Sequence, residues 1–403
     1  MMRTLRLIGL ISLIGLMGCS KDQEQADRQF ISFEAQPLMQ TFYEELSANA
    51  GRLSGITRAW TPPTGYYLYD ATDGEGNPIL YPIAEEQVSL INKSIDIFMT
   101  QDGTAPLHGA FYYKASNSTW HFDAEIEHSG DYYLYGAIPK EVVESSSISS
   151  SSTENDNSGY SNGAVLKLNG LRTVTHSDLC VIVGAKEGTD DHTVSDLTTG
   201  QFKVNVSSAT KNASSGTNHV FLLFDHLYSA LRFNFKVDAT YNELRTIKLT
   251  KLELMAFESV GSNKLKAKYN ATITLQKTTA GASPIQNIVF TPDNSSADVG
   301  YEPIYDGAEV TLNPTTATSL MGCIVPGNNT HFMLRSTYNV YDKSGNLVRE
   351  GCEAENDIDL RSLFNMTAVN LQRGHMYSLT LTVQPTYIYV LSEPDLKTEL
   401  TIE

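Results

Sequence analysis

Apolar and polar residues alternate at every second position over much of the chain. The segments WHFDAEIE (120–127), LRFNFKVD (231–238) and YSLTLTV (377–383) all follow this pattern. Because successive side chains of a strand point to opposite faces, a period of two predicts strands with one buried face. In TIKLTKLEL (246–254) the alternation changes register across Thr250–Lys251, which predicts a β-bulge. Several short strands separated by turns predict an all-β protein built from antiparallel sandwiches.

The N-terminal part of the chain departs from this pattern. A short strand is predicted near 31–35, and the residues that follow space their apolar side chains at helical intervals behind Pro37. That spacing predicts a short amphipathic helix near 37–48. Farther along, the serine-rich stretch 144–163 predicts a surface loop, and a second polar break just before residue 218 predicts a domain boundary.

Length and composition agree with this picture and restrict the partners. The 403 residues are enough for two domains of ordinary size, which we predict at 59–217 and 218–403. Hydrophobic residues make up 41% and charged residues 19%, as in globular proteins. The formal net charge of −17 argues against a nucleic-acid partner, because affinity for phosphates comes largely from clustered Lys and Arg.

The N-terminus predicts export and lipidation. Two arginines precede an apolar run at 7–17, which is shorter than the roughly 20 residues that a transmembrane helix needs. We therefore predict a secretory signal peptide over 1–18. Its ending, Leu-Met-Gly-Cys, resembles a bacterial lipobox, in which Cys19 becomes the lipidated first residue; an ordinary signal peptide is the alternative. Acyl chains would tether the protein without spanning the membrane, and Ser20 favours the outer membrane.

The residue types that carry catalysis or bind metals form no recognisable motif. The nine histidines show no H-E-x-x-H or comparable spacing, and there is no G-x-S-x-G elbow, P-loop or dinucleotide fingerprint. His121 and Asp123 share a strand face, which we interpret as solvated rather than metal-binding. DATDGEGN (70–77) lacks the closing acidic residue of a calcium loop and is interpreted as a turn. We predict no enzyme, no cofactor and no metal.

Three cysteines remain after the signal peptide and Cys19. Cys180, Cys323 and Cys352 are widely spaced, without the C-x-x-C pattern of metal or redox sites. Cys323 and Cys352 could form a disulfide in an oxidising compartment, or each could be a buried small hydrophobic residue. Both interpretations stay open.

Several pieces of the chain, in order along almost its whole length, resemble the fimbrillin-like proteins of Bacteroidales, the subunits of type V pili. These pieces are the lipobox at Cys19, ISFEA (31–35), TRA (57–59), GDYYLYGAIP (130–139), VFLLFDHLYSALRFNFKV (220–237) and VQPTYIYVL (383–391). Their order is more specific than any one of them. The chain departs from the family in the longer gap between ISFEA and TRA and in the serine-rich stretch.

The resemblance implies a fold and a mode of assembly. It implies two transthyretin-like β-sandwich domains in tandem, behind a tether and pro-segment at 19–58. An arginine-specific protease would cut between Arg58 and Ala59, and the strand near 31–35 would leave. A C-terminal strand of another subunit, taken from 386–403, would fill the groove left behind. Within that segment the alternating candidates for the donor strand are Ile388, Val390, Leu400 and Ile402.

The predicted function is therefore a structural subunit of a surface fimbria that assembles by protease-triggered donor-strand exchange and supports cell adhesion. Its partners would be other pilin subunits, the outer membrane through Cys19, the protease, and a receptor on a host or bacterial surface. The alternatives are an anchor or tip subunit, a monomeric surface lipoprotein that binds a glycan or host protein, and an extracytoplasmic hydrolase. A glycan site would need an aromatic platform, and Trp60 and Trp120 are the only tryptophans. The alternative for 386–403 is that its strands are the last core strands of the second domain.

Overall fold

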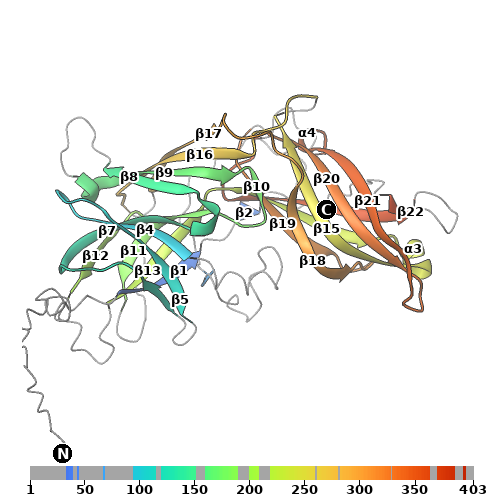
Figure 1. The fold of residues 1–403 in the computed structure, drawn as a ribbon, viewed down its shortest axis with the longest axis horizontal. Coiled ribbons are helices and arrows are strands. Elements are labelled where there is room, and N and C mark those ends of the chain that lie inside the picture. The colour runs from blue at the N-terminus through green and yellow to red at the C-terminus, as the bar shows by residue number, and fades with distance from the viewer. Residues whose placement is uncertain are drawn as a thin grey trace, which may run out of the picture.

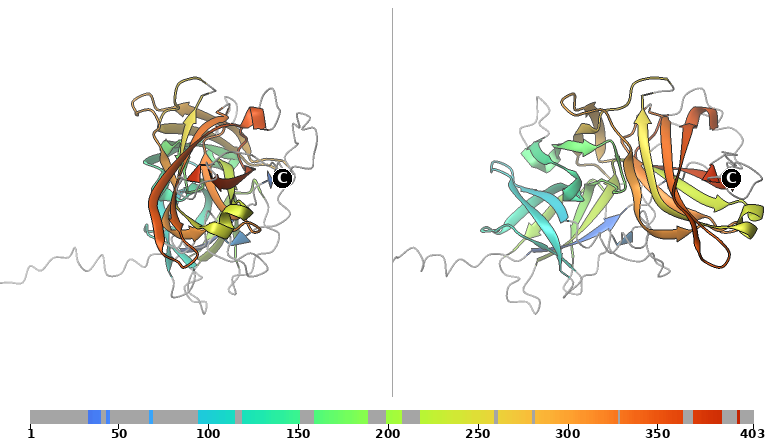
Figure 2. Two further views of the ribbon diagram at one scale, coloured as in Figure 1. Left: turned by 90° about the vertical axis from the view of Figure 1, so that its right-hand side faces the viewer. Right: turned by 45° about the vertical axis from the view of Figure 1, so that its right-hand side comes forward.

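The protein is almost entirely β in the computed structural model, which arranges its strands in four sheets (Figure 1). Two groups of sheets lie side by side along the long axis, and each group surrounds a hydrophobic core (Figures 1 and 2). The structure describes residues 33–39, 43–44, 67–68, 94–114, 119–150, 159–188, 199–207, 218–258, 261–279, 282–327, 329–363, 370–385 and 394–395.

The first group contains a nine-stranded sheet that curls back on itself, because β11 pairs with β13 at one edge and with β7 at the other. Its order is β11 (Cys180–Glu187), β13 (Asn218–His226), β1 (Phe33–Met39), β6 (Thr119–Phe122), β5 (Leu107–Lys114), β4 (Ser94–Thr100), β7 (Gly130–Ile138) and β12 (Lys203–Val206), with β3 (Tyr67–Leu68) beside β1.

A four-stranded sheet packs against it. The order is β17 (Ile285–Pro292), β16 (Lys268–Gln276), β9 (Gly163–Arg172) and β8 (Ser145–Ser150). Alternate side chains of β9 and β16 point into the first core, which includes the fully buried Leu166, Leu168 and Ile273. The loop predicted at 144–163 is wrong for β8, because that stretch pairs with β9 at the sheet edge. Two short 3-10 helices, η1 (Lys140–Val142) and η2 (Gly159–Asn162), flank β8.

The second group consists of a six-stranded and a four-stranded sheet around the second core. The six-stranded sheet has β10 (Val174–Thr175), β19 (Thr318–Ile324), β14 (Ser229–Val237), β22 (His375–Pro385) and β2 (Tyr43–Glu44), with β23 (Pro394–Asp395) beside β22. The four-stranded sheet has β18 (Glu302–Thr311), β15 (Thr246–Phe257), β20 (His331–Tyr341) and β21 (Leu347–Asp359). The helices α3 (Ala239–Leu244) and α4 (Leu360–Leu363) lie at its ends.

The alternation in the sequence is confirmed in the second core. Phe233 and Phe235 of β14 and Leu379 and Leu381 of β22 are buried, as the period of two requires. The pairings of β15 with both of its neighbours change register between Leu249 and Lys251, so the predicted bulge is confirmed as well.

The boundary between the two cores does not fall at residues 217 and 218. β13 lies in the first group, whereas β14, only two residues later, belongs to the second. The chain then returns to the first group with β16 and β17 before it completes the second. A polar break in the sequence predicts a connection between strands, but it carries no information about which sheet accepts the next strand.

The helix predicted near 37–48 is wrong for 37–39 and 43–44, and the rest of that segment lies outside the described residues. Residues 37–39 continue β1, and residues 43–44 form β2, which pairs with β22. Every residue of β1 pairs with a residue of β13. The free energy of this pairing outweighs the weak helical preference indicated by only three apolar residues at helical spacing. Within the described ranges, no helix is long and apolar enough to cross a bilayer.

Candidate functional site

The most unusual element of the fold is β1, the first described strand of the chain. It lies between β13, with which it pairs in parallel from Phe33↔Asn218 to Met39↔Phe224, and β6 and β3, which pair with it in antiparallel orientation. Figure 2 shows β1 in blue on the first group, pointing toward the second. A strand from the N-terminal segment therefore fills an interior position between β6, which follows it by almost ninety positions, and β13, which follows it by 185 positions at Phe33↔Asn218.

The inner face of β1 anchors it in the first core. Phe33 and Ala35 are buried, at 4% and 0% exposure. The Phe33 ring lies 5.4 Å from the ring centroid of Phe111 and 6.3 Å from that of Phe122. Trp120 is buried directly opposite Ala35 across the β1–β6 pair. Aromatic contacts of this kind stabilise by about 0.5–1.5 kcal/mol each beyond the area they bury.

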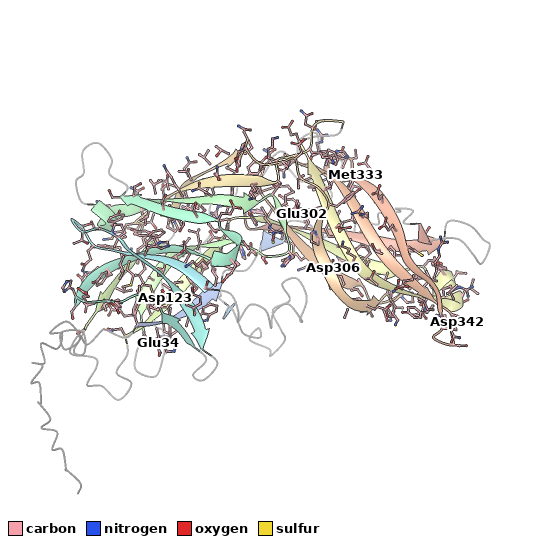
Figure 3. The ribbon with its side chains drawn as sticks, in the orientation of Figure 1. Glu34, Asp123, Glu302, Asp306, Met333 and Asp342 are labelled. Carbon is pink, nitrogen blue, oxygen red and sulfur yellow. The ribbon has the colours of Figure 1, made fainter. Side chains whose placement is uncertain are left out.

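The outer face of β1 carries a buried carboxylate. Glu34 is directly opposite His121 on β6 and directly opposite His219 on β13, so a histidine flanks it on each side. Its Oε1 is 3.2 Å from Nδ1 of His121, and its Oε2 is 3.9 Å from Nδ1 of His219. Figure 3 labels Glu34 at the lower margin of the first group. Because a buried carboxylate needs polar partners, this triplet favours one register of β1 over a slip by one residue.

Removing β1 would leave a groove of defined chemistry. The backbone N–H and C=O groups of β13 and β6 that now pair with β1 would lose their partners. The aromatic side chains of Phe111, Trp120 and Phe122 would lose the cover that Phe33 and Ala35 supply. Unpaired strand edges beside an apolar floor accept an added strand, since main-chain hydrogen bonds and side-chain pockets are then both satisfied.

Of the predicted donor segment 386–403, the structure describes only residues 394 and 395. β22 pairs with β14 in parallel, and its end pairs with β23 through Gln384↔Asp395 and Pro385↔Pro394. The remaining predicted site residues lie outside the described residues: Cys19, Arg58, Ala59, Ile388, Val390, Leu400 and Ile402, together with Trp60 and the turn at 70–77.

The pair His121 and Asp123 does not form a joint site. His121 faces Glu34, whereas Oδ1 of Asp123 accepts a hydrogen bond of 2.6 Å from the backbone N–H of Ala110. The interpretation of this face as merely solvated is wrong for His121, because β1 covers it. No sequence signal indicated Glu34 as its partner, since the pairing joins segments almost ninety positions apart.

A serine, an aspartate and a histidine meet on β8, β4 and β5. Asp96 accepts hydrogen bonds from the Ser146 hydroxyl at 2.5 Å and from Nε2 of His108 at 2.8 Å. The carboxylate lies in the middle, so the hydroxyl donates to a weak base and not to the imidazole. A serine nucleophile requires the histidine beside it, and this order of contacts therefore ties strands together rather than activating a nucleophile.

The three cysteines of the described residues, Cys180, Cys323 and Cys352, are buried and form no disulfide bond with one another. Cys323 belongs to the first core and Cys352 to the second, so the bridge between them that the sequence left open is not present. Burial raises the pKa of both the Cys180 and the Cys323 thiols. The structure also brings Cys180 next to Asp178 and His226, a group that sequence spacing did not indicate because its members lie on two distant strands.

No protein-family model matches the chain, and no curated protein matches it. Similar solved structures include a candidate cell adhesion protein of Bacteroides fragilis, with 11% identity, a TM-score of 0.39 and coverage of 91% of this chain and 98% of that one. A fimbrial protein of Bacteroides vulgatus has 12% identity, a TM-score of 0.29 and coverage of 75% and 91%. The fimbrial anchor protein Mfa2 of Porphyromonas gingivalis has 9% identity, a TM-score of 0.24 and coverage of 88% and 92%. The structural neighbours are thus cell adhesion and fimbrial proteins of Bacteroidales.

Proposed function

We propose that the chain is a structural, non-catalytic subunit of a surface fimbria and that β1 is a built-in plug. Cleavage after Arg58 would release the N-terminal segment, and a strand from residues 386–403 of another subunit would then enter the groove between β13 and β6. The observation that carries the proposal is the position of β1. Among the described elements it is the one nearest the N-terminus, yet it is paired on both sides and anchored by Phe33.

The same proposal places the protein at the cell surface. Lipidation of Cys19 would tether the exported chain to the outer membrane. The two groups of sheets, which we propose to be two transthyretin-like domains, would place the groove and the donor strand at separate positions on the molecule. Cleavage after Arg58 would remove both the lipidated Cys19 and β1. The same cut would therefore release the subunit from the membrane and open the groove. A subunit that kept the Arg58–Ala59 bond would instead remain an anchor.

A glycan-binding role is less well supported. Trp120 is 1% exposed and packs opposite Ala35, so it offers no aromatic platform to a sugar.

Limited proteolysis of the Ser20–Glu403 protein with an arginine-specific protease tests the proposal. Mass spectrometry locates the cut, and electrophoresis without boiling follows assembly. We expect a cut after Arg58 and a ladder of SDS-resistant polymers. Arg58→Gln should block both, whereas Arg52→Gln, a matched change in the same segment, should not. Truncation at Thr386 should allow the cut and abolish the ladder.

Two results would contradict the proposal in different ways. An Arg58–Ala59 bond that resists the protease would favour an anchor subunit. A cut protein that stays monomeric would favour a surface protein that acts alone.

A further inference from the structure

The cluster of Asp178, Cys180 and His226 is assembled by strand register. Cys180 is the first residue of β11 and lies directly opposite His226, the last residue of β13. Asp178 precedes Cys180 by two residues in the segment that enters β11. The backbone N–H of Leu227 donates a 2.8 Å hydrogen bond to the carbonyl of Leu179, which holds the two segments together at this point. The side chains are therefore placed by backbone pairing and not by flexible loops.

Two of the three separations between the ligand atoms lie close to the spacing of a tetrahedral metal site, and the third is a short hydrogen bond. Sγ of Cys180 is 3.4 Å from Nδ1 of His226 and 3.1 Å from Oδ2 of Asp178, and Nδ1 is 2.5 Å from Oδ2. Zinc bonds of about 2.0–2.2 Å to nitrogen and oxygen and about 2.3 Å to sulfur place tetrahedral ligands roughly 3.3–3.6 Å apart. An ion would displace the proton between Nδ1 and Oδ2 and open that contact by less than about 1 Å.

Two residues of the cluster are shielded from solvent, and the third is partly exposed, so an ion could reach the cluster from its side. Cys180 and His226 are almost fully buried, whereas the Asp178 side chain retains 12% exposure. The second carboxylate oxygen, Oδ1 of Asp178, is buried and has no hydrogen-bond partner. A divalent cation would use the unpaired oxygen, and its charge would favour the thiolate form of Cys180 as a ligand.

We propose that Asp178, Cys180 and His226 bind one divalent transition-metal ion, with Zn²⁺ as the expected occupant. One sulfur, one nitrogen and one oxygen ligand suit Zn²⁺, and the free Oδ1 or a water completes the coordination. The ion would join the start of β11 to the connection between β13 and β14, where the chain passes from the first core to the second. On the other side of that connection, Nη1 of Arg373 donates to Oδ2 of Asp225 at 2.7 Å and to the carbonyl of His226 at 3.1 Å. The metal would thus stabilise the connection between β13 and β14, to which Arg373 of the second group already donates hydrogen bonds. The site lies at the end of β13, beyond Phe224, where the pairing with β1 stops, and the proposal does not depend on the fimbrial role.

Cobalt spectroscopy on the full chain tests the site. Every sample carries Cys19→Ser, so that only Cys180, Cys323 and Cys352 remain as thiols. After treatment with a chelator under reducing conditions, Co²⁺ is titrated and the absorption is recorded. We expect one equivalent to bind, with the d–d bands of a tetrahedral ion and a thiolate charge-transfer band, and Zn²⁺ to displace it.

The variants separate a metal site from a hydrogen-bonded trio. Cys180→Ser should remove the charge-transfer band and weaken binding by more than about tenfold, the loss that even changes around the ligands commonly cause. Asp178→Asn should keep the band but weaken binding. Cys352→Ser, which removes a buried thiol of the second core, should bind as the parent does.

The proposal is overturned if the parent binds no stoichiometric Co²⁺, if Cys180→Ser keeps the charge-transfer band, or if Cys352→Ser loses it equally. Circular dichroism checks that each variant is folded. Should Cys180→Ser fail to fold, Asp178→Asn decides the matter, and an unchanged affinity in that variant would overturn the site.

Discussion

At the scale of single residues, Phe33 has the largest buried apolar side chain described on β1. Its ring contacts the rings of Phe111 and Phe122 and covers them in the space between β13 and β6 that β1 occupies. If β1 is a removable plug, its attachment should depend on this side chain more than the rest of the molecule does. The substitution Phe33→Ala isolates that contribution.

We expect Phe33→Ala to weaken the docking of β1 by about 3–5 kcal/mol, the usual range for a buried phenylalanine. Hydrogen exchange should become faster in 33–39 and 218–224 and remain unchanged in the second core. Phe235→Ala is the matched control, because Phe235 is equally buried but belongs to the second core. Faster exchange throughout both cores after Phe33→Ala would show that β1 is an inseparable part of the fold.

At the scale of elements, a cluster of polar side chains ties β18 to β15 and β20. Glu309 accepts hydrogen bonds from Nζ of Lys248 at 2.7 Å, from the Tyr341 hydroxyl at 2.5 Å and from Nδ2 of Asn339 at 2.7 Å. The bond from Lys248, followed by those from Tyr341 and Asn339, lowers the pKa of Glu309 from 4.5 to about 2. The ionised carboxylate is therefore the form that the folded state prefers.

This shift makes the stability of the second group depend on pH. Because the pKa is lower in the folded state, the stabilisation is fully present above about pH 4.5 and is lost as the pH falls toward 2. Urea unfolding between pH 6 and pH 2.5 should show a smaller loss of stability with acid in Glu309→Gln than in the parent. Lys248→Met, which removes the first donor, should also reduce the loss. Equal acid sensitivity in all three proteins would contradict the assignment.

At the scale of the whole molecule, the two cores are joined by repeated crossings of the chain. The first core needs β1 and β13 in one sheet and β16 and β17 in the other, and all except β1 come from residues after 217. A cut at the polar break before residue 218 therefore divides the first core and not the space between the cores.

We expect the fragment 59–217 to lack a cooperative unfolding transition when it is produced alone, because it lacks those four strands. Near-ultraviolet circular dichroism and urea titration measure this directly. Mixing it with the fragment 218–403 and a peptide of residues 31–45 should restore the transition in part, which is the control for damage by the cut itself. Cooperative unfolding of 59–217 alone would show that the first sheet closes without its later strands.

The sequence by itself determined the all-β class and the buried faces of individual strands. Phe233 and Phe235 are buried on β14, and the bulge beside Lys251 lies where the alternation slips, because a period of two is a local property that any partner strand must respect. The resemblance in ordered short pieces predicted the fimbrillin-like class, which remains a prediction from the sequence.

Only the tertiary structure decided which strands are neighbours and which side chains meet. Local spacing favoured a helix at 37–48, but pairing with β13 and β22 produces strands at 37–39 and 43–44. Glu34 meets His121 and His219, and Cys180 meets His226, across pairs that no short motif records. The physical reason is that the period of two indicates only which side chains of a strand face the core. Which strands pair depends on the total free energy of contacts between segments that lie far apart in the chain.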